Sequence, residues 1–272
     1  MKMIAVWIML VTSLYAISVQ EKVRYLDNIK TLIILTETMR GNTNVYTKGE
    51  TMDIKVVEKD RAAVSKALKK LHKVFEQANL SQDRSFQEID KYIQNLNEVA
   101  SELDSMVTFK ANSLLIKEML RIGGAAQVKF FSQPDTLNYK ASQVMMFQIL
   151  PMTEYLGQLR GLSAGEVACH GCSNDESLEY IKDYLAEAND ALYELTTQMK
   201  VLKKHYPRHY EVLSYDEVLV YEREVKHYLD HIEAVVINKQ PVADQDCDFF
   251  VQGTKMISQT LRYYDINKAA IE

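Results

Sequence analysis

Glycine and proline are scarce in this chain, with 9 glycines and 4 prolines among 272 residues. No run of alternating polar and apolar residues persists either. The sequence therefore lacks both the turn residues and the period-two pattern of an all-β protein. We expect an all-α fold, and a chain of this length can build one large or two small hydrophobic cores.

The motifs of the common enzyme classes are also missing. The sequence contains no phosphate-binding glycine loop, no Gly-x-Ser-x-Gly nucleophile elbow and no His-Glu-x-x-His pair. Its formal net charge is −5, with acidic and basic residues interspersed, which argues against a general nucleic-acid-binding surface. We expect neither an enzyme nor a nucleic-acid partner. Any anion site must be a local concentration of positive charge.

Long apolar runs are absent except near the amino terminus, where residues 3–14 form a run of 12. Small residues follow at Ala16 and Ser18, and the pattern is typical of a secretory signal peptide over residues 1–18. The run is shorter than the roughly 20 residues of a membrane-spanning helix. We expect a periplasmic or secreted protein, with an uncleaved N-terminal membrane anchor as the alternative.

Cysteine is rare, with three residues in the chain. Cys169 and Cys172 form a C-x-x-C element, and because Ser173 rather than histidine follows it, covalent haem attachment is excluded. An oxidising compartment favours a disulfide between Cys169 and Cys172, although Cys247 can pair with either one instead. Metal binding that includes His170 is a weaker alternative, because zinc needs a fourth ligand. We predict no metal and no cofactor.

Helical periodicity runs through the rest of the chain. It predicts eight helices at about residues 20–46, 50–79, 82–103, 108–131, 135–167, 174–205, 207–238 and 244–268. Pro134 separates the first four helices from the last four, and Pro151 predicts a kink in the fifth. Short connections make successive helices antiparallel neighbours. We predict an elongated molecule of two up-and-down four-helix bundles from a duplicated unit, at residues 19–132 and 133–272.

One short pattern occurs twice, 120 residues apart. The first copy contains Arg40-Gly41 and the second Arg160-Gly161, the two Arg-Gly dipeptides of the chain. Each arginine lies on a mostly apolar stripe of its helix. The residues of a stripe follow one another at spacings of three or four and therefore fall within roughly 40° of one line along the helix. The stripes consist of Leu26, Ile29, Ile33, Thr36 and Arg40 in the first copy and Met146, Ile149, Thr153, Leu156 and Arg160 in the second. Since a buried cation is costly unless it is neutralised, two such arginines could share one small anion.

The guanidinium group offers planar, bidentate donors that suit a flat oxyanion. Thr43 and Ser163 follow the arginines by three residues, and we predict them as further hydrogen-bond donors. In the alternative, each arginine pairs with a carboxylate of a neighbouring helix. Arg40 also has Glu37 three residues before it, whereas Arg160 has no acidic residue three or four positions away. A face of small residues typical of close helix packing consists of Gly157, Gly161 and Gly165.

These segments resemble a known family. Residues 159–165 (LRGLSAG) are similar to the Arg-Gly-Leu-Ser signature of nitrate- and nitrite-sensing (NIT) domains, and residues 39–46 (MRGNTNVY) resemble a variant of it. Residues 248–257 (DFFVQGTKMI) resemble the end of that domain. The resemblance covers about residues 20–268. It departs from the family where Glu or Gln commonly precedes the arginine and this chain has Met or Leu.

The resemblance implies two four-helix bundles that hold nitrate or nitrite between arginines near their junction, with Arg40 and Arg160 as the anion ligands. Family members usually carry a kinase, cyclase, chemoreceptor or RNA-binding output domain. We therefore predict an exported sensory module that passes its signal to a membrane receptor or sensor kinase. A second copy of the chain, giving a homodimer, is a further candidate partner. One alternative is a ligand-free structural or adaptor bundle. A metal or cofactor carrier is a third.

Overall fold

The computed structural model describes residues 17–47, 53–77, 84–99, 104–168, 175–241 and 248–272. Within these ranges the chain is helical and has no strand, which confirms the predicted all-α fold. The predicted signal peptide lies outside the described residues except for its last two positions. The predicted disulfide residues Cys169 and Cys172, and also Cys247, lie outside them too.

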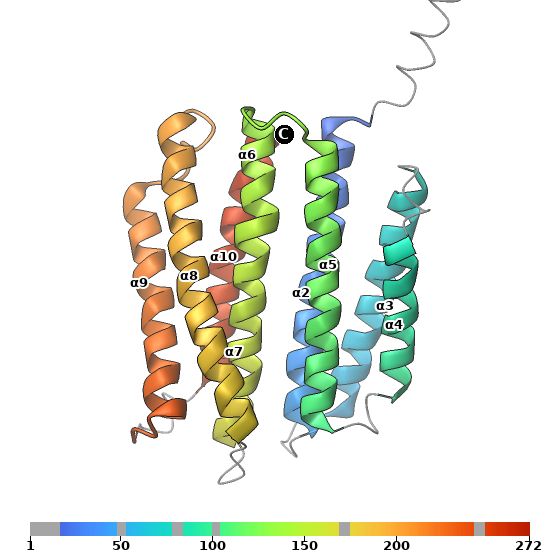
Figure 1. The fold of residues 1–272 in the computed structure, drawn as a ribbon, viewed down its shortest axis with the longest axis vertical. Coiled ribbons are helices and arrows are strands. Elements are labelled where there is room, and N and C mark those ends of the chain that lie inside the picture. The colour runs from blue at the N-terminus through green and yellow to red at the C-terminus, as the bar shows by residue number, and fades with distance from the viewer. Residues whose placement is uncertain (1–16, 48–52, 78–83, 100–103, 169–174, 242–247) are drawn as a thin grey trace, which may run out of the picture.

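Eight long helices, two of which contain a π-helical turn, run up and down through the described part of the chain (Figure 1). The first four are α2 (Val19–Thr47), α3 (Ile54–Gln77), α4 (Arg84–Val99) and α5 (Ser105–Phe130). The fifth is α6 (Leu137–Val144), which continues through η1 (Met145–Ile149) into α7 (Leu150–Ala168). The last three are α8 (Asp175–His205), α9 (Tyr215–Ile232) with η2 (Glu233–Ile237), and α10 (Phe249–Ile271).

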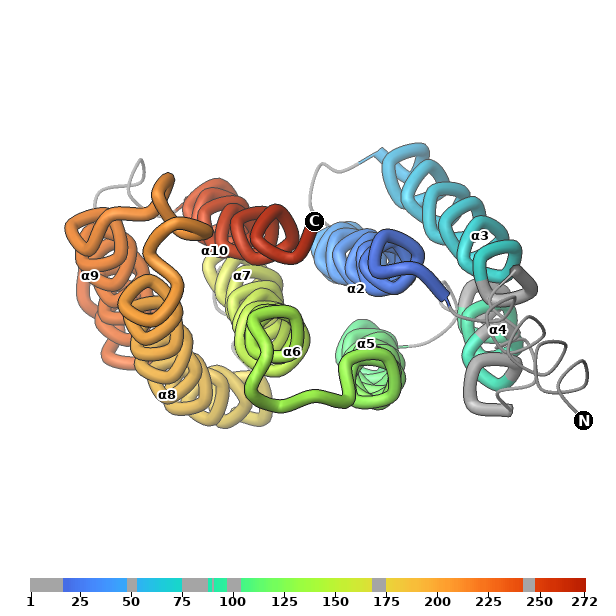
Figure 2. Tube along the Cα trace, turned by 90° about the horizontal axis from the view of Figure 1, so that it is seen from above, coloured from blue at the N-terminus to red at the C-terminus, as the bar shows by residue number. Residues whose placement is uncertain are grey.

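The first helices of the two predicted units lie side by side in the middle of the molecule. Figure 2 shows α2, α5, α7 and α10 at the centre, with α3 and α4 on one side and α8 and α9 on the other. α2 packs against both α5 and α7, and α7 packs against α10. Because α2 and the α6–α7 helix both run from top to bottom in Figure 1, equivalent positions of the two units lie at the same end of the molecule.

Both predicted stripes are buried along their whole length, including the two arginines. The buried apolar residues of the two halves form one continuous cluster. The connection between α5 and α6 lies at residues 131–136, where we placed the boundary between the bundles. The division into two bundles at this point stays a prediction. Among the described helices, none is both long and apolar enough to cross a membrane.

Pro151 is the second residue of α7 and lies just after the π-helical turn η1. Proline lacks a backbone N–H, and its ring crowds the carbonyl four residues earlier, so a regular α-helical turn is disfavoured there. The N–H of Leu150 instead donates to the carbonyl of Met145, five residues back. A widened turn therefore stands where the sequence predicted a kink.

The seventh helix begins at Tyr215. The sequence pattern predicts a start at residue 207, and this prediction is wrong. Ser214 and Glu217 form a capping box that starts the helix. In the preceding loop Tyr210 is fully buried, and its hydroxyl donates to Oδ1 of Asn267 on α10 at 2.7 Å. The loop thus packs against α10, and the capping box sets the later start.

Replacing Tyr210 with Phe should lower the free energy of unfolding by about 1–3 kcal/mol, because the buried Oδ1 of Asn267 would lose its donor. Chemical denaturation of the two proteins measures the difference. Tyr193→Phe is the matched control, since Tyr193 is 70% exposed, and it should change stability by less than about 0.5 kcal/mol. Equal effects of the two substitutions would contradict the assigned role of Tyr210.

Candidate functional site

Arg40 lies near the carboxyl end of α2 and is only 1% exposed. Its Nη1 donates to Oε1 of Glu154 on α7 and, at 2.8 Å, to Oγ of Ser113 on α5. The guanidinium carbon lies 4.8 Å from the centre of the Phe109 ring on α5, a cation–π distance. Side chains from α5 and α7 therefore hold one edge and one face of this group.

Arg160 has a parallel environment near the carboxyl end of α7 and is 4% exposed. Its Nη1 donates to Oγ1 of Thr254 on α10 at 3.0 Å. Its guanidinium carbon lies 4.8 Å from the centre of the Phe250 ring on the same helix. A hydroxyl and an aromatic ring thus support each arginine, but only Arg40 has an ion pair shown within the described part of the chain.

The supporting residues repeat between the units. Phe109 and Ser113 are four residues apart on α5, and Phe250 and Thr254 are four apart on α10. Each hydroxyl also donates to the carbonyl of its own phenylalanine, at 2.9 Å and 2.7 Å. The fourth helix of each unit therefore presents a Phe-x-x-x-Ser/Thr pair to the arginine of the first helix. This repeat was readable in the sequence, and our prediction missed it.

Glycines let the two arginine-bearing helices cross closely. A Cβ on Gly161 would lie 3.7 Å from the Cα of Gly41. Nη2 of Arg40 lies 3.2 Å from the position of a Cβ on Gly157, and Nη2 of Arg160 lies 3.6 Å from that of a Cβ on Gly41. Each guanidinium thus lies over a glycine of the opposite helix. The packing role predicted for Gly157 and Gly161 agrees with these contacts.

Several buried donors at this crossing lack a hydrogen-bond partner among the described residues: Nε and Nη2 of Arg40, Nε of Arg160 and Oγ of Ser163. Nε and Nη2 form one complete edge of a guanidinium, the kind that binds planar oxyanions with two parallel hydrogen bonds. Since buried polar groups are nearly always hydrogen-bonded, this edge is a place for an acceptor. Thr43, the fourth predicted site residue, is buried on α2 one turn after Arg40.

Two buried glutamates accompany the arginines. Glu154 accepts hydrogen bonds from Arg40 and from Nε2 of Gln158, and Glu37 accepts one from Oγ1 of Thr153 at 3.3 Å. The ion-pair partner of Arg40 is therefore Glu154 of the neighbouring helix and not the local Glu37. Sequence spacing on one helix could not identify this partner, because Glu154 is distant in sequence from Arg40.

Burial determines the protonation of this cluster. It raises the pKa of Glu37 to about 8, the Glu154 charge acts in the same direction, and both arginines oppose the rise. Burial also raises the pKa of Glu154, against the effect of its bond to Arg40. The pKa of Arg160 is lowered by burial first and also by Arg40, while Glu37 opposes this. The two arginines therefore act on each other electrostatically.

A cleft of about 500 Å³ between α5, α7 and α8 reaches the cluster from the surface. Ser113 and Glu154, which both bond Arg40, line it together with Gln158. Lys110 and Lys117 of α5 also line the cleft. Asp183 and Glu187 of α8 line it as well, so the entrance carries charges of both signs.

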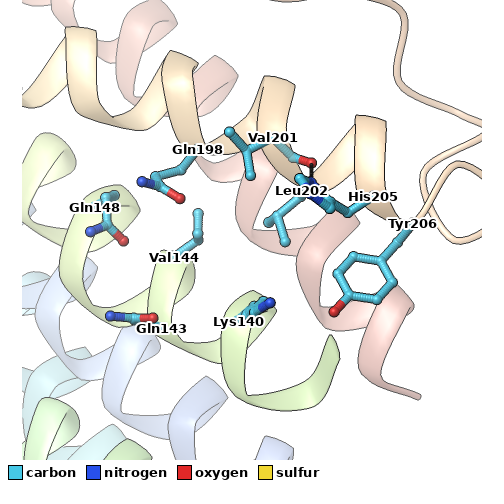
Figure 3. A pocket seen from close by; sticks show the side chains of 9 residues that line it. All are labelled: Lys140, Gln143, Val144, Gln148, Gln198, Val201, Leu202, His205 and Tyr206. Carbon is cyan, nitrogen blue, oxygen red and sulfur yellow. Dashed lines mark hydrogen bonds between the residues drawn. The ribbon is translucent and has the colours of Figure 1, made fainter. Parts of the chain in front are cut away.

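A second hollow, of about 210 Å³, lies between α6, η1 and α8 (Figure 3). Its polar lining includes Lys140, Gln143, Gln148, Gln198, His205 and Tyr206. On one helix, Lys140 precedes Arg160 by 20 residues and Gln148 precedes it by 12, which places this hollow roughly 18–30 Å from Arg160. It is separate from the arginine site. Among the described side chains, no three of His, Cys, Asp or Glu are placed to hold a metal ion.

Comparisons with known proteins bear on the fold. No protein-family model matches the chain, and no curated protein matches it either. Among solved structures, the fold is similar to that of the NasR transcription antiterminator, with a TM-score of 0.68 at 14% sequence identity. The match covers 98% of this chain and 73% of that one. The likeness extends over both halves of the chain, and at this identity it shows the fold alone.

Gly253→Ala should destabilise the protein by about 1–3 kcal/mol. A Cβ at this position on α10 would lie 2.6 Å from Oη of Tyr228 and 2.8 Å from Cβ of Arg160. Gly41→Ala is the matched control, because its Cβ would meet Arg160 at an ordinary 3.6 Å and alanine favours a helix over glycine. Thermal unfolding compares the variants, and a Gly253→Ala protein as stable as Gly41→Ala would contradict this close contact.

Glu37 should make stability depend on pH. Its carboxyl keeps its proton in the folded protein up to a pKa of about 8, whereas it ionises near 4.5 when unfolded. Stability should therefore fall as pH rises from about 4.5 to 8, by up to about 1.4 kcal/mol per pH unit for this one proton. Denaturation across this range should show a flatter profile for Glu37→Gln. The exposed control Glu211→Gln should follow the wild type, and parallel profiles for all three would refute the assignment.

Proposed function

We propose that this protein is an exported sensory module that binds nitrate or nitrite where α2 crosses α7 and passes the signal to a partner protein. The observation that carries the proposal is the unpartnered, buried Nε–Nη2 edge of Arg40 beside a second buried arginine. This edge matches the flat, two-oxygen face of such an anion.

The remaining ligands follow from the same crossing. At this crossing Nε of Arg160 and Oγ of Ser163 are further buried donors without a partner among the described residues, and they come from α7, whereas Arg40 comes from α2. An anion held by both sets would bridge the two helices. Thr43 is proposed as a further donor, because it follows Arg40 as Ser163 follows Arg160.

The resemblance of the Arg-Gly segments to nitrate- and nitrite-sensing domains supports this choice of anion. The likeness to the NasR transcription antiterminator concerns the fold alone, and that fold is the helical arrangement on which the proposed site depends. The family resemblance and the fold likeness each extend over nearly the whole of the chain that the structure describes.

Ligand size limits the affinity. Nitrate has four heavy atoms, and at a best-case ~1.5 kcal/mol per atom its binding free energy reaches about 6 kcal/mol, or tens of micromolar. A coupling of about 1–3 kcal/mol is usual for allostery. Binding across the α2–α7 crossing could change how the two halves sit against each other. If nitrate left both the melting temperature and the small-angle scattering unchanged, this mechanism would be wrong.

One observation favours the second candidate, a ligand-free structural or adaptor bundle. The Arg40–Glu154 ion pair with its hydrogen bond to Ser113 is an arrangement that stabilises a buried arginine without any ligand. Under this alternative the unpartnered donors would take water, and no small anion would bind with selectivity.

Isothermal titration calorimetry with sodium nitrate and sodium nitrite separates the two candidates. The wild type should bind with a Kd of tens of micromolar or weaker. Arg40→Lys keeps the charge but lacks the bidentate edge, and Arg160→Ala removes the second cation, so each should weaken binding by about tenfold or more. Arg121→Lys is the matched control, because Arg121 is exposed and pairs with Glu118.

Binding by the control at the wild-type affinity, together with loss in the two site variants, would support the sensory function. Circular dichroism and thermal unfolding show whether each variant is folded. Absence of heat with either anion in the folded wild type would favour the structural bundle.

A further inference from the structure

Four ionisable side chains meet at the α2–α7 crossing, and their charges limit what the site can bind. Arg40 and Glu37 come from α2, and Arg160 and Glu154 from α7. All four are at most 5% exposed. With both glutamates ionised the cluster would be neutral, and it would offer an anion no net attraction.

The two glutamates are not equivalent. Glu154 accepts hydrogen bonds from Arg40 and Gln158, which stabilise its charged form. Glu37 accepts a single long bond of 3.3 Å from Thr153, and its Oε2 is buried without a partner among the described residues. The carboxyl with fewer donors is the one that holds a proton, and the pKa of Glu37, raised to about 8 by burial, agrees.

Among the described residues, the ionisable groups that act most strongly on Glu37 come from α2 and α7. They are Arg40 on α2 and Glu154 and Arg160 on α7. At this level α5 contributes Ser113 and Phe109, α10 contributes Thr254 and Phe250, and α3 contacts α2 through Asp60, which accepts a hydrogen bond from Asn42.

Oε2 of Glu37 and Nη2 of Arg40 border the same point next to Gly157 of α7. The point that a Cβ on Gly157 would occupy lies 3.2 Å from Nη2 of Arg40 and 3.6 Å from Oε2 of Glu37. A protonated Glu37 therefore presents an O–H donor next to the guanidinium donors. An ionised Glu37 would place a negative oxygen there instead.

We infer that the site binds one monovalent oxyanion together with one proton, which Glu37 holds, and that this charge balance discriminates against divalent oxyanions such as sulfate. With Glu37 protonated, two guanidinium groups and one carboxylate give a net charge of +1, which a single monoanion neutralises. Loss of the proton removes both the charge and the donor. This inference rests on the proposed function and specifies its ligand class.

The test is calorimetric titration of the full chain with sodium nitrate from pH 6.5 to 9.5 at constant ionic strength. Wild-type affinity should be level below about pH 8 and fall about tenfold per pH unit above it. Glu37→Gln keeps a neutral donor, so its affinity should stay level throughout. At pH 9, titration in two buffers of different ionisation enthalpy should show uptake of about one proton per nitrate in the wild type and none in Glu37→Gln.

Two further measurements use the wild-type protein alone, so they do not depend on the folding of a variant. The second tests whether the charge of the anion affects binding. In the wild type at pH 9, nitrate should increase the infrared carbonyl band of a protonated carboxyl group. Sulfate at pH 7 should bind at least tenfold more weakly than nitrate.

The outcomes separate this inference from the proposed function. Nitrate binding with the same pH profile in wild type and Glu37→Gln, or sulfate binding as tight as nitrate, would overturn the inference and leave the sensory function standing. A decline of equal size in both proteins counts as such a shared profile and would likewise overturn the inference. No nitrate binding at any pH would overturn both proposals.

Discussion

Two positive charges are buried next to each other where α2 crosses α7, and much of the surrounding structure offsets their cost. Removing a guanidinium from water is expensive unless it is paired and hydrogen-bonded. Here one carboxylate, two aromatic faces and two hydroxyls surround the pair. With Glu37 protonated, as its raised pKa favours, the cluster carries one positive charge in excess. That excess is the charge that the proposed anion would neutralise.

The packing of α2 against α7 explains how the two arginines come together. The first helices of the two units are neighbours that run in the same direction (Figures 1 and 2). Gly41 and Gly161 hold equivalent places in the repeat, and they meet at the crossing. The fourth helix of each unit packs on the first and supplies its aromatic ring and hydroxyl.

The acidic residues break this symmetry. Glu37 precedes its own arginine by three residues, and Glu154 precedes Arg160 by six. Glu154 therefore pairs with Arg40 across the crossing, whereas Glu37 has a weaker hydrogen bond and a raised pKa. Arg40 has one edge occupied and one free, and Arg160 is held by a hydroxyl. Because the two halves share one core at this level, a ligand bound there would contact both of them.

The amino-acid sequence by itself determined the helical class, the number of long helices within the described residues, and the burial of both arginines, because helical periodicity is a local property. It also predicted close packing at Gly157 and Gly161. It misplaced the start of α9, since the Ser214 capping box outweighed the break at Pro207. Only the tertiary structure decided which carboxylate pairs with Arg40, which arginine edge stays free and which glutamate has its pKa raised to about 8. Those outcomes depend on contacts between helices more than 100 residues apart in the chain, and no local pattern records such contacts.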